Sequence, residues 1–260
     1  MSARARIERF LNWRTAIAEF LILVVGILLA LAVDRWADEY HDAQTASEYI
    51  ARLRSDVATD LAAYADTVAW SNSIDDSTQY VLQVYRGRNP GPEEYDLLAL
   101  HIYRASWGVT GRTTTTTYDD LVSTGNMALL PVRIRDAITR YYGLKTAYER
   151  RLTELEETAR RGYWRVPEHV LGPDLAPVVW LGIQGRTSDF SVAPGDLGLS
   201  EAEARQTIDR LRNVADLETL LAEIRHHMVQ RMILFGERLP KAARELDSAL
   251  QHEVNPVAMN

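Results

Sequence analysis

An uncharged apolar run, from Phe20 to Val33, constrains this chain more than any other sequence feature. Its fourteen residues (FLILVVGILLALAV) span about 21 Å as an α-helix, less than the roughly 30 Å hydrocarbon core of a bilayer. Extending the run to residues 16–36 gives sufficient length, at the cost of including Glu19. The sequence therefore predicts one transmembrane helix over residues 16–36.

The residues on either side of this segment predict its orientation. Trp13 and Trp36 bracket the segment and suit the aromatic belts at the two membrane interfaces. The preceding residues carry four arginines, the last of them Arg14, against a single glutamate, whereas the following flank is mainly acidic. The positive-inside rule then predicts that residues 1–15 form a short basic cytoplasmic tail. Residues 37–260 would form a domain on the opposite side of the membrane, outside the cytoplasm.

Two other interpretations of the apolar run remain open. A cleaved signal peptide is the first, because Ala30-Leu31-Ala32 matches the small-residue pattern of a cleavage site. The long charged leader and Glu19 argue against it. The core helix of a soluble protein is the second, and the one-sided arginine cluster argues against that.

Charge and cysteine content exclude several classes of protein. The net charge is −7, and residues 1–15 contribute +3, so the remainder carries −10 (−7 minus +3). An acidic domain lacks the basic patch of a nucleic-acid-binding surface, so no nucleic-acid partner is predicted. The absence of cysteine excludes disulfides, thiolate metal sites and cysteine nucleophiles.

The remaining residues predict helices, and the expected fold class is all-α. No glycine or proline occurs between Ile27 and Arg86, so the anchor is expected to continue as a long helix, weakest at residues 71–76, where short polar side chains favour a break. Its inward stripe has three-and-four spacing: Ile50, Leu53, Val57, Leu61, Tyr64 and Val68. Further helices are expected from Pro92 to about Trp107, from Pro131, from the Ser200–Glu203 capping box and from Asp216, the last kinked or restarted at Pro240. Together they predict an extramembrane antiparallel helical bundle.

Two segments have no periodic pattern. Residues 163–199 hold four of the nine prolines and five of the fourteen glycines and are expected to form a long loop. This loop contains Trp180 and would pack on the bundle or contact a partner. Five consecutive threonines, Thr113 to Thr117, favour a helix N-cap before a short helix ended by Gly125, with a hydroxyl-lined ligand site as the alternative.

Two blocks of sequence carry a resemblance to a family. The first is EFLILVVGILLALAVDRWADE, from Glu19 to Glu39, and the second is TTTTYDDLVSTGNMALLPVRIRDAITRYY, from Thr114 to Tyr142. The chain resembles an uncharacterised family of bacterial single-span membrane proteins, a domain of unknown function. That family joins an E-apolar-GI-apolar-D-W anchor to a downstream T-Y-L-STG-YY block. The resemblance implies topology and fold and adds no chemistry.

One weak pattern of possible metal-ligating residues occurs in the chain. Glu223 and His226 form an E-x-x-H pair on a helix, the spacing used by di-iron bundles, but such a site needs a second pair and two more glutamates. Asp38 with His41 is the nearest second pair, and it is expected at the membrane surface. No catalytic, phosphate-binding or dinucleotide-binding motif occurs. We therefore predict no catalytic residue, no cofactor and no metal, and the protein is not expected to be an enzyme.

A stripe of the anchor predicts how the protein meets a partner. At 100° per residue, Glu19, Gly26, Ala30 and Ala37 lie within about 40° of one another on a helix. Small residues permit close approach of a second helix, while Glu19 would pair with a donor on that helix or extend to the interface. The expected function is a structural or scaffold subunit of a larger membrane complex (respiratory, photosynthetic or envelope), in contact with lipid and with other subunits. The alternative is a periplasmic ligand-sensing bundle that signals through a partner.

Overall fold

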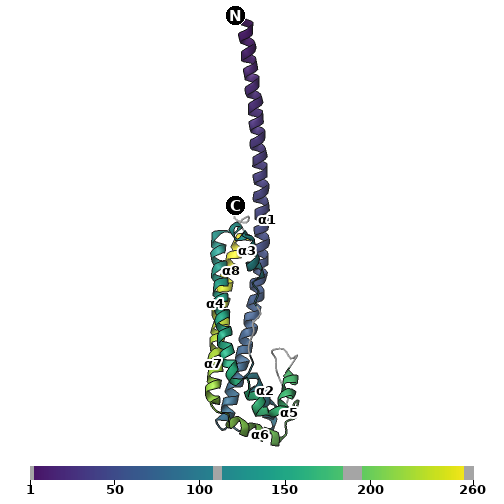
Figure 1. The fold of residues 1–260 in the computed structure, drawn as a ribbon, viewed down its shortest axis with the longest axis vertical. Coiled ribbons are helices and arrows are strands. Elements are labelled where there is room, and N and C mark those ends of the chain that lie inside the picture. The colour runs from purple at the N-terminus through teal and green to yellow at the C-terminus, as the bar shows by residue number, and fades with distance from the viewer. Residues whose placement is uncertain (1–2, 108–112, 184–194, 255–260) are drawn as a thin grey trace.

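A computed structural model shows an all-helical chain dominated by one helix of 83 residues. The structure describes residues 3–107, 113–183 and 195–254, and within these ranges it contains helices and no strand. The helix α1 (Ala3–Tyr85) extends far beyond the bundle as an isolated rod (Figure 1). The expected all-α class, with an apolar N-terminal helix that continues into a bundle, is confirmed.

Three long helical stretches run side by side in the bundle (Figure 1). The first is the C-terminal half of α1, and the second is α4 (Val132–Tyr163). The third consists of α7 (Leu217–Ile233), the π-helical segment η3 (Leu234–Arg238) and α8 (Leu239–Val254). It runs antiparallel to the other two. We call the end from which α1 emerges the near end, and the opposite end the far end.

Short helices close the two ends of the bundle. The 3₁₀ turn η1 (Pro92–Glu94), α2 (Tyr95–Arg104), α5 (Val166–Ile183) and α6 (Glu201–Arg212) lie at the far end. Helix α3 (Thr116–Thr124) and the 3₁₀ turn η2 (Asn126–Leu129) lie at the near end. Glycine ends α3 as expected, because Gly125 adopts the left-handed conformation with φ 76°.

The buried apolar side chains form two clusters along the bundle. The inward residues expected on α1 are buried or half-buried. On the third stretch the buried side chains include Leu217, Leu221, Ile224, Met228, Phe235 and Leu239. The near-end core includes Leu53, Val57, Tyr64, Ile134, Ile138, Tyr141, Leu239 and Leu246. The far-end core includes Ile74, Val81, Leu98, Ile102, Val170, Val179, Leu211 and Leu221. Each buried large apolar side chain contributes about 1.5–3 kcal/mol relative to exposure, so α1 is held at both ends of the bundle.

Residues 71–76, the expected weakest point of α1, do not break the helix, which continues to Tyr85. The hydroxyl groups that were expected to compete with the helix bond to its own carbonyls instead. Ser71 Oγ donates to the Thr67 carbonyl at 2.8 Å, and Thr78 Oγ1 donates to the Ile74 carbonyl at 2.7 Å. Burial against α7 and the far-end core stabilises the helix more than these short side chains weaken it.

The expected loop over residues 163–199 contains a helix, since α5 occupies Val166–Ile183, while residues 184–194 lie outside the described residues. Gly172 interrupts this helix with φ 81°, a conformation open to glycine, and Pro173 then occupies a first-turn position where no backbone donor is needed. The apolar residues of the segment become the buried face of α5, including Val170 and Val179. Proline and glycine therefore mark a kink here rather than a loop.

Pro240 neither ends nor clearly restarts the last long helix. The turn before it widens into a π-helical segment, in which the Leu239 backbone N–H donates to the carbonyl of Leu234 five residues earlier. Proline cannot donate to the carbonyl four residues before it, and a wider turn accommodates the missing bond. The helical axis continues from α7 into α8.

Candidate functional site

A buried ion pair joins α1 to α4 at the middle of the bundle. The side chains of Asp60 and Lys145 are both fully buried, and Lys145 Nζ lies 2.7 Å from Asp60 Oδ2. The same carboxylate oxygen accepts a hydrogen bond from the Tyr141 hydroxyl at 2.6 Å, and that hydroxyl lies 2.8 Å from the Tyr64 hydroxyl. Because burial of unpaired charge is costly, this network is stable only when every member is present.

The network also fixes the threonine run in place. The Thr114 backbone N–H donates to Asp60 Oδ1 at 3.0 Å, and Lys145 Nζ donates to the Thr114 carbonyl at 2.7 Å. Thr115 Oγ1 donates to Asp119 Oδ2 at 2.7 Å within the first turn of α3. The run thus connects the buried network to α3, which accounts for its position without a ligand. Burial, reinforced by Tyr64 and Asp60, raises the pKa of Tyr141 above its ordinary value.

An aromatic pocket at the far end of the bundle is the best candidate for a binding site. It is a cavity of about 790 Å³ between the C-terminal end of α2 and helix α5. Tyr103, Ser106 and Trp107 line one side. The other side is formed by Trp164, Glu168, Gly172, Pro173, Ala176, Pro177 and Trp180. Cavities of this size lined by aromatic groups and a few polar ones are typical of small-molecule sites.

Three aromatic rings of the pocket contact one another. The Trp180 ring centroid lies 5.8 Å from that of Tyr103 and 5.8 Å from that of Trp107, the latter in an edge-on arrangement. Trp107 in turn stacks on Trp70 of α1 with centroids 5.7 Å apart. Trp180 remains 39% exposed, so part of its ring is available to a ligand. The pocket is therefore connected by ring contacts to the helix that carries the apolar segment.

Two sequence features place these side chains. The kink at Gly172 turns the second half of α5 so that Trp180 reaches α2, and a side chain at position 172 would bring its Cβ to 2.8 Å from Arg210 Nη1. Ser106 Oγ donates to the Tyr103 carbonyl at 2.6 Å just beyond the end of α2. Glycine at position 172 is thus required by its positive φ, whereas the Arg210 guanidinium is the end of a flexible side chain that can move aside.

Electrostatics in the pocket are set by one carboxylate. Glu168 is the only charged residue among the described lining residues, and it forms no ion pair with any residue in the described ranges. Burial raises the pKa of Tyr103, and the negative charge of Glu168 raises it further. The carboxylate is thus close enough to act on the aromatic side of the pocket.

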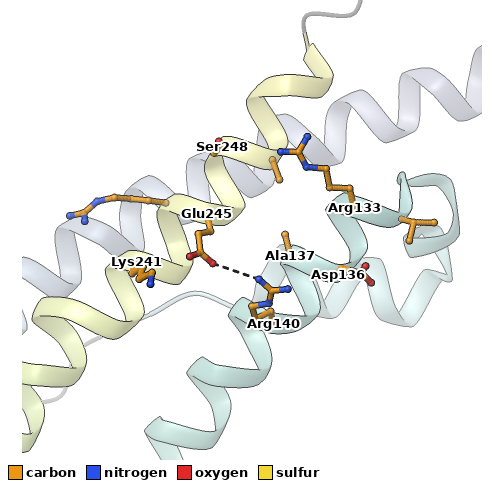
Figure 2. Close-up of a pocket in the computed structure, with 10 residues that line it drawn as sticks. Arg133, Asp136, Ala137, Arg140, Lys241, Glu245 and Ser248 are labelled. Carbon is orange, nitrogen blue, oxygen red and sulfur yellow. Dashed lines mark ion pairs between the residues drawn. The ribbon is translucent and has the colours of Figure 1, made fainter.

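A second cavity, of about 780 Å³, lies between α4 and α8 and is lined mainly by charged residues. Figure 2 shows Arg140 of α4 extending toward Glu245 of α8, and the two charged groups are 3.7 Å apart. Arg133, Lys241 and Arg244 also line it. Because both members of the ion pair are largely exposed, it contributes at most about 1 kcal/mol. This groove is a solvated charged surface between two helices.

The predicted anchor stripe lies entirely on the isolated part of α1. Glu19, Gly26, Ala30 and Ala37 are all exposed, and no heavy atom lies within 4 Å of a Cβ built on Gly26. One candidate membrane span is found in the described residues, near the N-terminus, with none of its apolar window buried in the protein. The exposed stripe is thus open to lipid or to another helix.

The structure describes the side chains of only some of the residues predicted to lie at the membrane interfaces. Trp13 and Trp36 are both largely exposed. The side chain of Arg14 lies outside the described residues. Trp180, predicted for partner binding, is the one predicted site residue, among those whose side chains the structure describes, that lines a cavity.

The E-x-x-H pair lies on α7 without further ligands. Glu223 and His226 are exposed, and His226 Nε2 lies 2.7 Å from Gln230 Nε2. Within the described residues, no three His, Asp or Glu side chains converge as metal ligands would. Asp38 and His41 are exposed on α1 and precede Tyr49, the first buried apolar residue described on this helix.

Sequence reasoning missed most of the aromatic pocket. Tyr103, Trp107 and Glu168 lie on segments separated by some sixty residues, and no periodicity links them. The available signal was tryptophan on both segments, with Trp107 on the first and Trp164 and Trp180 on the second. Comparison with known protein families, curated proteins and solved structures finds no match.

Proposed function

We propose that the protein is a non-enzymatic, membrane-anchored interaction protein, an accessory or scaffold subunit of a larger membrane complex (respiratory, photosynthetic or envelope). In this proposal α1 crosses the bacterial inner membrane once, with residues 1–15 in the cytoplasm and the bundle in the periplasm. The supporting observation is the isolation of the apolar segment, whose side chains pack against no other helix in the described chain. The resemblance to bacterial single-span proteins is part of the same proposal.

The anchor stripe would be the contact with the partner. Lipid gives no reason to concentrate small residues on one face, whereas a second helix packs closely against them. Glu19 lies on the same face and would accept a hydrogen bond from that helix, since an unsatisfied carboxylate in the bilayer is costly. The stripe and the exposed carboxylate together favour association with another membrane subunit.

The test uses a matched pair of variants in the anchor. Gly26→Leu fills the stripe, and because no atom lies within 4 Å of the added Cβ, it leaves the fold of the chain unchanged. Val25→Leu is the control, since Val25 is also exposed but points about 100° away. Affinity purification from native membranes should lose co-purifying subunits with Gly26→Leu and retain them with Val25→Leu. Equal retention by both variants would show that the stripe faces lipid.

A second function, a periplasmic bundle that senses a ligand and signals through a partner, is favoured by a specific observation. The aromatic pocket is open, and Trp107 in its wall stacks on Trp70 of α1. A ligand that shifted Trp107 would therefore act on the helix that also crosses the membrane. Ligand-dependent change in the co-purified partners would test this function.

A further inference from the structure

We propose that the aromatic pocket binds an organic ammonium cation, a ligand with a substituted nitrogen of the choline or tetramethylammonium type. This inference deepens the ligand-sensing function and rests on it. It assigns the chemical class of the ligand from the residues that line the cavity.

Aromatic side chains make up much of the pocket lining. Three tryptophans and one tyrosine line the cavity, and tryptophan is the side chain whose ring face attracts a cation most strongly. Trp180 contacts Tyr103 on one side and Trp107 on the other, so the three rings form a continuous wall. Trp164 and Trp180 keep 54% and 39% of their surface exposed, so ring surface remains for a ligand.

The single charge among the described lining residues also favours a cationic ligand. Glu168 supplies a negative charge beside this wall, and no arginine or lysine occurs among the described lining residues to neutralise it. An anionic ligand would be repelled, while a cation would gain both the carboxylate and the ring faces. Quaternary ammonium groups are recognised elsewhere by this combination, because they are weakly hydrated and carry their charge on an apolar surface.

Charge on the molecule as a whole acts in the same direction. The net charge is −7, and the basic residues near the N-terminus belong to the other end of α1, so the bundle itself is more acidic. An acidic protein raises the local concentration of cations near its surface. The α4–α8 groove is, by contrast, lined by four basic and two acidic residues, so a cation is disfavoured there.

The binding experiment uses the full chain in an alkyl maltoside, because detergents with phosphocholine head groups would compete for the pocket. Choline is titrated by calorimetry and by tryptophan fluorescence, and 3,3-dimethyl-1-butanol serves as the neutral ligand of the same shape. Choline should bind saturably and at least about tenfold more tightly than the neutral alcohol, the ratio given by about 1.4 kcal/mol of cation–π attraction. Equal affinities would overturn the cation assignment and leave an apolar ligand site. Absence of saturable binding by both would overturn the site itself.

Three variants locate the binding. Trp180→Ala should abolish choline binding, and Glu168→Gln should weaken it by about two- to fivefold, the range for a partly solvated charge. Trp36→Ala, at an exposed tryptophan outside the pocket, is the matched control and should bind as the unmodified chain does. Because Trp180→Ala alters packing between α2 and α5, circular dichroism accompanies it. Unchanged choline affinity in Glu168→Gln would refute the electrostatic role even if Trp180→Ala misfolds. Failure of these titrations leaves the anchor proposal intact, since that proposal is tested by co-purification of Gly26→Leu.

Discussion

Lys145 of α4 and Asp60 of α1 form an ion pair of 2.7 Å with no exposed surface on either side chain. Their sequence separation of 85 residues makes this pair a long-range connection between two parallel helices. Both carboxylate oxygens and the ammonium also bond to the threonine run or to Tyr141. The pair therefore fixes three segments relative to one another. Such a pair gives specificity of packing more surely than net stability, because desolvation offsets much of its attraction.

Breaking this pair from one side should destabilise the bundle strongly. Lys145→Met leaves Asp60 buried and uncompensated, and we expect the free energy of unfolding to fall by about 3–5 kcal/mol. Lys241→Met, at an exposed position, is the control and should change it by less than about 0.5 kcal/mol. Urea unfolding in detergent measures both. Adding Asp60→Asn to Lys145→Met should recover part of the loss, because the stranded charge is removed; no recovery would contradict this account.

Stability should fall at mildly acidic pH because of His101. Its Nδ1 lies 3.0 Å from Ser77 Oγ, and its ring stacks on Tyr80 with centroids 4.3 Å apart. Burial, with repulsion from Arg104 and Arg88, lowers the pKa of His101 to about 4. The unfolded imidazole, with a pKa of about 6.5, binds a proton that the folded one does not. The stabilisation that the neutral His101 gives the folded state is therefore complete above pH 6.5 and is lost as the pH falls toward 4.

Because of His101, the free energy of unfolding should fall by about 2 kcal/mol between pH 8 and pH 5. Unfolding curves at several pH values measure it, with His101→Gln as the comparison. The variant should show a flatter dependence over this range. His227, whose pKa is lowered by its burial, adds a smaller effect of the same sign in both proteins. Identical pH dependence in the two proteins would show that His101 is not the group responsible.

Substituting alanine for two glycines that have no close neighbours should change the free energy of unfolding in opposite directions. Gly125 and Gly143 both have no atom within 4 Å of an added Cβ, but Gly125 has φ +76°. Gly125→Ala should destabilise by about 1–2 kcal/mol because the left-handed conformation is strained for alanine. Gly143 lies inside α4, so Gly143→Ala should stabilise by about 1 kcal/mol. Thermal unfolding of both variants is the measurement. Changes of the same sign would contradict the role given to φ.

The proposed orientation predicts where the end of the chain lies. A reporter fused after Asn260 should be active only when it functions outside the cytoplasm, so alkaline phosphatase should be active and a cytoplasmic fluorescent reporter dark. Replacing the arginines at positions 4, 6, 9 and 14 with glutamate should reduce or invert this preference, because the positive flank governs insertion. Cytoplasmic activity of the unmodified fusion would overturn the topology.

Short-range sequence patterns predicted some structural elements correctly and others incorrectly. The Ser200–Glu203 capping box occurs as expected, with Ser200 Oγ accepting from the Glu203 N–H and Glu203 Oε2 accepting from the Ser200 N–H. It depends on residues three positions apart, which the sequence displays directly. The loop expected over 163–199 was wrong for residues 166–183, because the apolar face of α5 is stabilised by the far-end core. Tertiary burial there outweighs the local preference of proline and glycine.

The sequence by itself determined the class of the protein: one apolar segment, a long helix that continues from it, and amphipathic helices enough for a bundle. These properties follow from hydrophobic composition and from periods of three and four residues, which are local. Only the tertiary structure decided which distant residues meet, namely Asp60 with Lys145 and Tyr103 with Trp180. Such contacts depend on the order and direction of packed helices and on the kink at Gly172, and no short-range pattern encodes them. The candidate site is therefore a property of the fold, whereas the anchor is a property of the sequence.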